Sequence, residues 1–160
     1  MSYSKNSPAG FVFTPANGPM QCPAFSVPFK LLAVTIVTLA MLWAWHMASQ
    51  GLIELTLQSS GWLGAALAMM AYTEWHILTG RTTLDPQFLQ QTWVWRKRVA
   101  LNELAYVKLF RVPGMDWLIA PRLYTRTYSN KLSVFYAASP AMLAEFGRLE
   151  ASLASFRQQA

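Results

Sequence analysis

The stretch "LLAVTIVTLAMLWAWHMA", Leu31 to Ala48, decides the fold class because it holds 18 residues without a formal charge. As a helix it would be about 27 Å long, at about 1.5 Å per residue, close to the roughly 30 Å of a membrane's hydrocarbon core. A soluble chain of 160 residues seldom encloses so long a helix that is apolar on every side. Residues 31–48 are therefore predicted to cross a membrane, and a buried helix in a soluble core is the alternative.

A second predicted span covers residues 61–78, "GWLGAALAMMAYTEWHIL". Small residues allow helices to approach closely in lipid, and those that we expect at a helix contact are Gly61, Gly64 and Ala68. Only 12 residues link the two spans, which predicts an antiparallel hairpin over residues 30–80. The same small residues suit a second copy of this chain or a foreign helix, so both a homo-oligomer and another membrane subunit stay open as partners.

The charges that flank the hairpin predict its orientation. Lys30 precedes the first span, Arg81 and the run Arg96, Lys97 and Arg98 follow the second, and the link contains no Lys or Arg. Positively charged flanks stay on the cytoplasmic side. We therefore expect a protein of the bacterial inner membrane with two spans and with both termini in the cytoplasm.

Residues 1–29 precede the hairpin and contain five of the nine prolines of the chain. This composition predicts an irregular leader that cannot form a helix. The leader lacks a basic segment directly beside a short apolar core, and no small-residue cleavage site follows the apolar run. We expect the leader to be retained.

Polar side chains near the end of the second span raise two hypotheses. Glu74 and His76 lie within about one turn of the expected cytoplasmic end, where they could simply reach the headgroups. Alternatively, Glu74 pairs with Lys30 or with a cation on a partner subunit, because acids within a membrane are costly without a partner. His46 and His76 would lie on the order of 20 Å apart in the hairpin, too far to hold one haem. No cofactor is expected.

Residues 81–160 are predicted to form a small α+β domain. Five segments have strand-like composition: residues 82–91, 92–101, 103–112, 122–129 and 132–137. Residues 129–131, "SNK", indicate a hairpin turn. Ser139 and Pro140 then begin a helix whose apolar residues recur every three or four positions, with Glu145 on its solvated side. We expect this amphipathic helix to close a curved antiparallel sheet.

Catalytic and metal-binding patterns are scarce in this half of the chain. Residues 81–160 contain no His and no Cys, and Cys22 is the single cysteine of the sequence. This composition disfavours a zinc site, a Cys/His dyad and a disulfide framework. Asp85 and Asp116 lie in turn-like contexts beside proline or glycine. We therefore expect no catalytic residues and no metal ligands.

Four features can be compared with known families: the two spans, the "LTGRTTLD" entry into the first strand, the segment "WVWRKRVALNELAYVKL" and the final amphipathic helix. Together, over residues 31–157, they resemble small bacterial membrane proteins that carry a pleckstrin-homology-like domain. The resemblance implies a cytoplasmic sheet sandwich capped by a helix, which often serves in oligomerisation or in the assembly of membrane complexes. It implies no catalytic residues.

Two functions from different classes fit these expectations. The first is a non-catalytic accessory subunit or assembly protein that binds a larger membrane complex through its hairpin and its cytoplasmic domain. The second is a module that binds anionic lipids through basic residues such as Arg96, Lys97 and Arg98, each contributing about 1 kcal/mol near an anionic leaflet. Nucleic-acid binding is disfavoured because no recognisable binding motif accompanies the basic residues.

Overall fold

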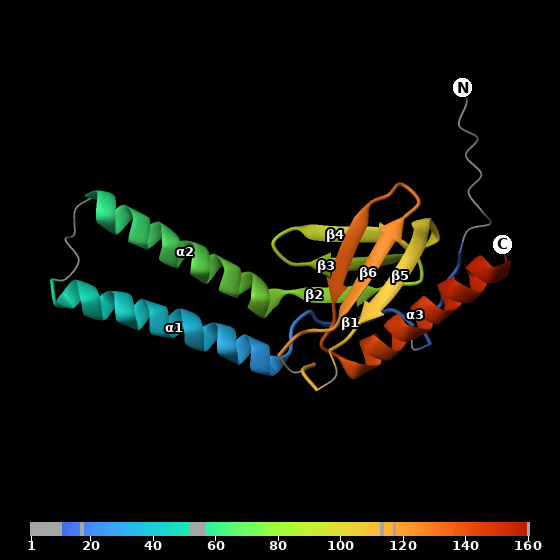
Figure 1. Cartoon of the computed structure of the whole chain (residues 1–160), viewed down its shortest axis with the longest axis horizontal. Coiled ribbons are helices and arrows are strands. Elements are labelled where there is room, and N and C mark those ends of the chain that lie inside the picture. The colour runs from blue at the N-terminus through green and yellow to red at the C-terminus, as the bar shows by residue number, and fades with distance from the viewer. Residues whose placement is uncertain (1–10, 17, 52–56, 113, 117, 160) are drawn as a thin grey trace, which may run out of the picture.

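The computed structural model describes residues 11–16, 18–51, 57–112, 114–116 and 118–159, with backbone alone for residues 57–60. Two long helices form a hairpin on one side of the molecule, and two antiparallel sheets with a third helix lie on the other side (Figure 1). The described part of the chain is therefore a small α+β fold with an attached helical hairpin. Residues 1–10 and 17 of the predicted leader lie outside the described residues.

The hairpin consists of α1, Val27–Ser49, and α2, Leu57–Thr79. The two helices run antiparallel and contact each other (Figure 1). Ser26 caps the start of α1, because its Oγ accepts a hydrogen bond from the Phe29 N–H at 3.3 Å. Both helices contain the predicted segments 31–48 and 61–78 and extend beyond them at either end.

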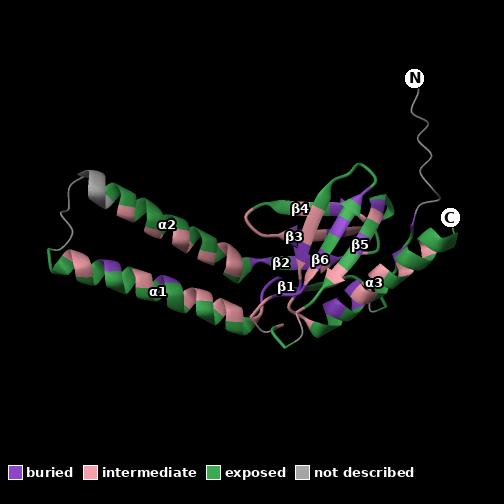
Figure 2. Cartoon of the chain, in the orientation of Figure 1, coloured by how far each residue is buried: buried purple, intermediate pink, exposed green. Residues whose placement is uncertain are grey.

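Few side chains of the hairpin are buried, although the helices are rich in apolar residues (Figure 2). In α1 the buried residues are Val37 and Ala44. Among the exposed side chains are Leu39, with 60% of its surface accessible, and Trp45, with 76%. The hairpin therefore presents apolar surface outward, opposite to the arrangement in a water-soluble core.

Among the described helices, α1 is the one that is long and apolar enough to cross a membrane, with a mean hydropathy of 1.9 in its most apolar window. Both helices contain 23 residues. α2 is less apolar because it carries Glu74, His76 and several hydroxyl and amide side chains. The prediction of a membrane helix near the N-terminus is thus supported by composition and length for α1.

The sheet domain contains seven strands in two sheets among the described residues, and in chain order the strands are β1 (Met20–Pro23), β2 (Arg81–Leu84), β3 (Phe88–Thr92), β4 (Arg96–Ala100), β5 (Leu104–Phe110), β6 (Arg122–Thr127) and β7 (Leu132–Tyr136). The first four strands form one sheet in the order β1-β2-β3-β4, and the last three form another in the order β5-β6-β7. A short 3-10 helix, Leu101–Glu103, joins the two sheets. α3, Pro140–Gln159, packs against β5 and β1.

The main core lies between the two sheets and α3. Its fully buried side chains include Leu89, Leu123, Phe135, Phe146 and Leu149. These residues come from both sheets and from the apolar face of α3, which confirms the prediction that the C-terminal helix covers a sheet. The turn predicted at 129–131 is also confirmed, since Asn130 adopts a left-handed conformation with φ of 64° between β6 and β7.

The prediction of an irregular leader over residues 1–29 is wrong for residues 20–23 and 27–29, whereas residues 11–16 have no regular helix or strand. Residues 20–23 form β1, and residues 27–29 already belong to α1, with proline at its first turn. Phe11 and Phe13 are buried in the main core, exposing 6% and 3% of their surface. The sequence did not predict β1 or the packing of this segment, because prolines indicate breaks in regular structure. Prolines do not exclude an edge strand or a packed segment.

The predicted strand pattern also needs two corrections. The segment 82–91 is two strands, β2 and β3, joined by a turn at Asp85 and Pro86, where the Asp85 N–H donates to the Phe88 carbonyl. The segment 92–101 is not one continuous strand, because residues 93–95 form a bend between β3 and β4. Trp93 and Trp95 therefore lie outside both strands.

Candidate functional site

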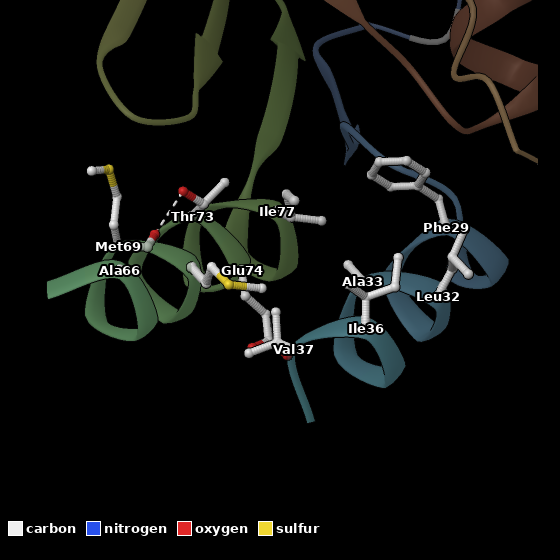
Figure 3. Close-up of a pocket in the computed structure, with 11 residues that line it drawn as sticks. Phe29, Leu32, Ala33, Ile36, Val37, Ala66, Met69, Thr73, Glu74 and Ile77 are labelled. Carbon is white, nitrogen blue, oxygen red and sulfur yellow. Dashed lines mark hydrogen bonds between the residues drawn. The ribbon is translucent and has the colours of Figure 1, made fainter. Parts of the chain in front are cut away.

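An apolar groove runs between α1 and α2 on the half of the hairpin nearest the sheet domain (Figure 3). Its volume is about 520 Å³. The residues that line it are Phe29, Leu32, Ala33, Ile36 and Val37 from α1, and Ala66, Met69, Met70, Thr73, Glu74 and Ile77 from α2. On each helix these residues recur at spacings of three and four, as expected for one continuous helix face.

Glu74 is the one charged side chain in the lining of this groove. Figure 3 shows it extending from α2 toward Val37 on α1. Within the described part of the chain, no hydrogen bond or ion pair engages its carboxylate. Thr73, beside it, is satisfied within α2, because its Oγ1 donates to the Met69 carbonyl at 2.8 Å.

The predicted pairing of Glu74 with Lys30 is absent from the described residues. Lys30 instead uses its Nζ to donate a hydrogen bond of 2.7 Å to the carbonyl oxygen of Leu78. The last carbonyls of a helix lack partners within the helix and form its negative end, so a lysine there is favourable. Lys30 thus connects the start of α1 to the end of α2, and among the described residues no cation pairs with Glu74.

Gly80 makes the transition from α2 to β2. A Cβ atom at this position would lie 2.9 Å from the His76 carbonyl oxygen and 3.4 Å from the Thr92 carbonyl oxygen. The Gly80 N–H donates to the His76 carbonyl, and its own carbonyl accepts from the Ala24 N–H. The hairpin is therefore joined to the first sheet through backbone contacts that only glycine fits closely.

The small residues predicted at a helix contact lie outside the groove. Gly61, Gly64 and Ala68 are exposed, and the space around Gly61 and Gly64 would be open even with a Cβ atom added. At 3.6 residues per turn, they lie roughly 180° around α2 from Ala66 and Met70. The hairpin therefore has two distinct surfaces on α2, the groove with Glu74 and an opposite face of small residues.

The two histidines lie at opposite ends of the hairpin, as the antiparallel prediction requires. His46 is in the last turn of α1, away from the domain, and His76 is in the last turn of α2, beside the domain. The His76 ring packs edge-on against Tyr72 with 4.5 Å between ring centres. This aromatic contact gives His76 a packing role at the end of α2.

The basic run lies on β4, which is an edge strand of the first sheet. Arg96 and Arg98 are exposed, whereas Lys97 is half-buried on the other face. Arg98 stacks over the Phe88 ring at 3.8 Å, and the Lys97 Nζ lies 5.6 Å from the centre of the Trp93 ring. The three charges therefore do not form one surface, and they also protect a sheet edge from pairing with another strand.

Three acidic side chains of the domain serve structural roles among the described residues. Glu145, predicted to be solvated, is buried; it accepts hydrogen bonds from Arg148 Nη1 at 2.8 and 2.9 Å and from the Ala16 N–H at 3.3 Å. The sequence pattern did not predict the burial of Glu145, because the N-terminal segment covers that side of α3. Glu150 accepts from the Leu109 N–H at 3.1 Å, and Asp116 pairs with Arg111.

Cys22 on β1 is buried beside the end of β7. Burial raises the pKa of its thiol, while hydrogen bonds with the backbone at Ser139 and Ala138 act in the opposite direction. A thiol of this kind is a poor nucleophile. Among the described residues, no three His, Cys, Asp or Glu side chains gather in a group that could hold a metal ion.

Sequence reasoning found Glu74 but missed the groove around it. The spacing of Ala66, Met70, Thr73 and Ile77 is that of one helix face, yet an apolar run gives no contrast by which to select that face. No known protein family matches the chain, and no curated protein or solved structure is significantly similar to it. A function is therefore inferred from the geometry and chemistry of the chain's own residues.

Proposed function

We propose that the chain is a non-catalytic accessory subunit or assembly protein of the bacterial inner membrane, anchored by α1 and α2 as two transmembrane helices. The hairpin would bind a larger membrane complex, and the sheet domain would lie at the cytoplasmic surface. One observation carries this proposal: a hairpin with exposed apolar side chains projects from a domain that has its own buried core.

The pairing of β1 with β2 supports two spans. β1 precedes α1, β2 follows α2, and Met20 to Pro23 lie opposite Leu84 to Arg81 in one antiparallel ladder. If α1 crosses the membrane, the chain must return to the same side before β2 can pair with β1. α2, with 23 residues and a length of about 34 Å, is long enough for that return.

The distribution of charge supports the cytoplasmic placement. Lys30 and Arg81 lie at the domain end of the hairpin, and residues 49–60 contain no Lys or Arg. The chain carries a net charge of +6, and all of it arises after residue 80. By the positive-inside rule, the domain end of the hairpin faces the cytoplasm.

The fold of the domain supports the proposed likeness to pleckstrin-homology-like domains. Two antiparallel sheets, of four and three strands among the described residues, and one final helix agree with the helix-capped sheet sandwich that this likeness implies. In this chain the hairpin is inserted between the first strand and the second. The domain would then hold both ends of the membrane anchor and present its remaining surface to partners.

Isolation of the native chain from its membrane in mild detergent tests the accessory role. We expect it to elute in a complex larger than itself, with other membrane subunits in fixed proportion. Glu74→Gln should leave insertion intact and weaken that complex. A chain that elutes alone, or only with copies of itself, would contradict the accessory role.

Binding of anionic lipid is the second candidate, favoured by the exposed Arg96 and Arg98. The test is the melting temperature of the full chain in nanodiscs of neutral or anionic lipid. A lipid-binding module should be stabilised by anionic lipid at low salt and lose that gain with Arg96→Gln and Arg98→Gln. An unchanged melting temperature would remove this candidate. The full chain is needed because β1, Phe11 and Phe13 complete the domain.

A further inference from the structure

The groove between α1 and α2 combines an apolar lining with one carboxylate. If both helices cross the membrane, Glu74 lies about 7 Å along the axis from the end of α2 at Thr79. An acid at such a depth is costly unless a cation or a hydrogen-bond donor faces it. The described residues supply neither to Glu74, which leaves its carboxylate open to a partner from another protein.

We propose that one transmembrane helix of another protein lies in this groove and places a lysine or arginine against Glu74. This inference rests on the proposed function and names the chemistry of the partner. The groove extends from Ala66 to Ile77, about 16 Å or three helical turns. Ala33 and Ala66, on opposite walls, allow the backbone of a third helix to approach closely.

A second copy of this chain does not supply the required cation. Lys30 is the one lysine or arginine within α1 and α2, and its Nζ is engaged by the Leu78 carbonyl. The free face of small residues, Gly61, Gly64 and Ala68, lies on the other side of α2 and carries no charge. The occupant of the groove is therefore a foreign helix with a basic residue.

A synthetic helix of 22 residues tests this inference. It consists of leucine and alanine with a single lysine placed six residues from its cytoplasmic end, and a matched peptide has methionine at that position. Both carry an acceptor dye, and the full-length chain carries a donor at Gln50→Cys in a Cys22→Ser background. Energy transfer is measured in vesicles of phosphatidylcholine, which has no primary amine.

The lysine peptide should bind the chain at least tenfold more tightly than the methionine peptide. Glu74→Gln should remove this preference, and Ala66→Phe should weaken both peptides by filling the groove. Glu54→Gln, which removes the only other acid of residues 31–80, should leave the preference unchanged. Equal binding of the two peptides to the unaltered chain would overturn the inference.

A lipid amine is the competing occupant. Two results together would show that the groove binds lipid: phosphatidylethanolamine stabilises the chain only when Glu74 is present, and the lysine peptide has no advantage in phosphatidylcholine. The proposal of a helix in the groove would then be wrong. Failure of the wider proposed function would be seen separately, because the labelling of Gln50→Cys in intact cells reports whether the hairpin is inserted at all.

Discussion

The hairpin and the sheet domain use similar apolar side chains in opposite ways. Leu39 on α1 exposes 60% of its surface, whereas Leu149 on α3 exposes none. In the domain, leucine and phenylalanine side chains are removed from water by two sheets and a helix. In the hairpin, apolar side chains of the same kind face outward, where lipid or a partner can cover them. Hydrophobicity alone therefore does not predict burial within a chain.

The largest expected effect comes from making the same substitution in both regions. Leu149→Ala should lower the free energy of unfolding by about 2–5 kcal/mol, because it leaves a cavity in the core. Leu39→Ala should change it by less than about 0.5 kcal/mol, because detergent surrounds that side chain. Chemical denaturation of the full chain in mild detergent measures both. Equal losses would show that the hairpin also folds around a core of its own.

The two regions also differ in how far sequence reasoning could predict them. The start signals Ser139 and Pro140 and the period of α3 predicted its position, because an amphipathic helix shows contrast between its faces. α1 and α2 were predicted by length and apolarity, which locate a helix without saying which side contacts its neighbour. Glu74 was found because a charge is conspicuous in an apolar run, whereas its groove became visible only when two helices were placed together.

The N-terminal segment was predicted least well, for a related reason. β1 has four residues, one of them polar and one of them proline, and its place in the sheet depends on pairing with β2 about 60 residues later. Phe11 and Phe13 are buried through contacts with α3 and its neighbours. Such long-range contacts leave no periodic signal in a short segment.

Substitution at the connection between the hairpin and the sheet domain should have the next largest effect on stability. Gly80→Ala should cost about 1–3 kcal/mol, because the added Cβ would lie 2.9 Å from the His76 carbonyl oxygen. Gly64→Ala is the matched control: nothing lies within 4 Å of its Cβ, and alanine favours a helix by about 1 kcal/mol. Thermal melting of the full chain compares the two. A Gly80→Ala variant as stable as the original would show that the connection is not tightly packed.

A smaller effect is expected where the N-terminal segment lies on α3. Glu145→Gln should lower the free energy of unfolding by about 1–2 kcal/mol, because it weakens the contacts with Arg148 and with the Ala16 N–H. It should also expose residues 11–16 to limited proteolysis. Glu103→Gln, at an exposed position, is the control. Cleavage at equal rates in the two variants would mean that Glu145 does not hold the segment.

The smallest effect concerns Cys22, which belongs to the domain although it precedes the hairpin. Its thiol should react slowly with a maleimide at neutral pH, whereas a cysteine introduced at the exposed Gln50 should react fast. Because burial raises its pKa above 9.0, the neutral thiol favours the folded state. The stability that the neutral Cys22 thiol contributes is fully present below pH 9, and it is lost as the pH rises through the raised pKa of the folded state. Fast labelling at neutral pH would place β1 outside the core.

The most direct test of the account is the topology of the hairpin. Two variants in a Cys22→Ser background, Gln50→Cys and Gln159→Cys, are treated with a membrane-impermeant maleimide in intact bacterial cells whose outer membrane has been permeabilised. The account predicts labelling of Gln50→Cys in intact cells and of Gln159→Cys only after lysis. Labelling of both in intact cells, or of neither, would contradict a hairpin that crosses the membrane and returns.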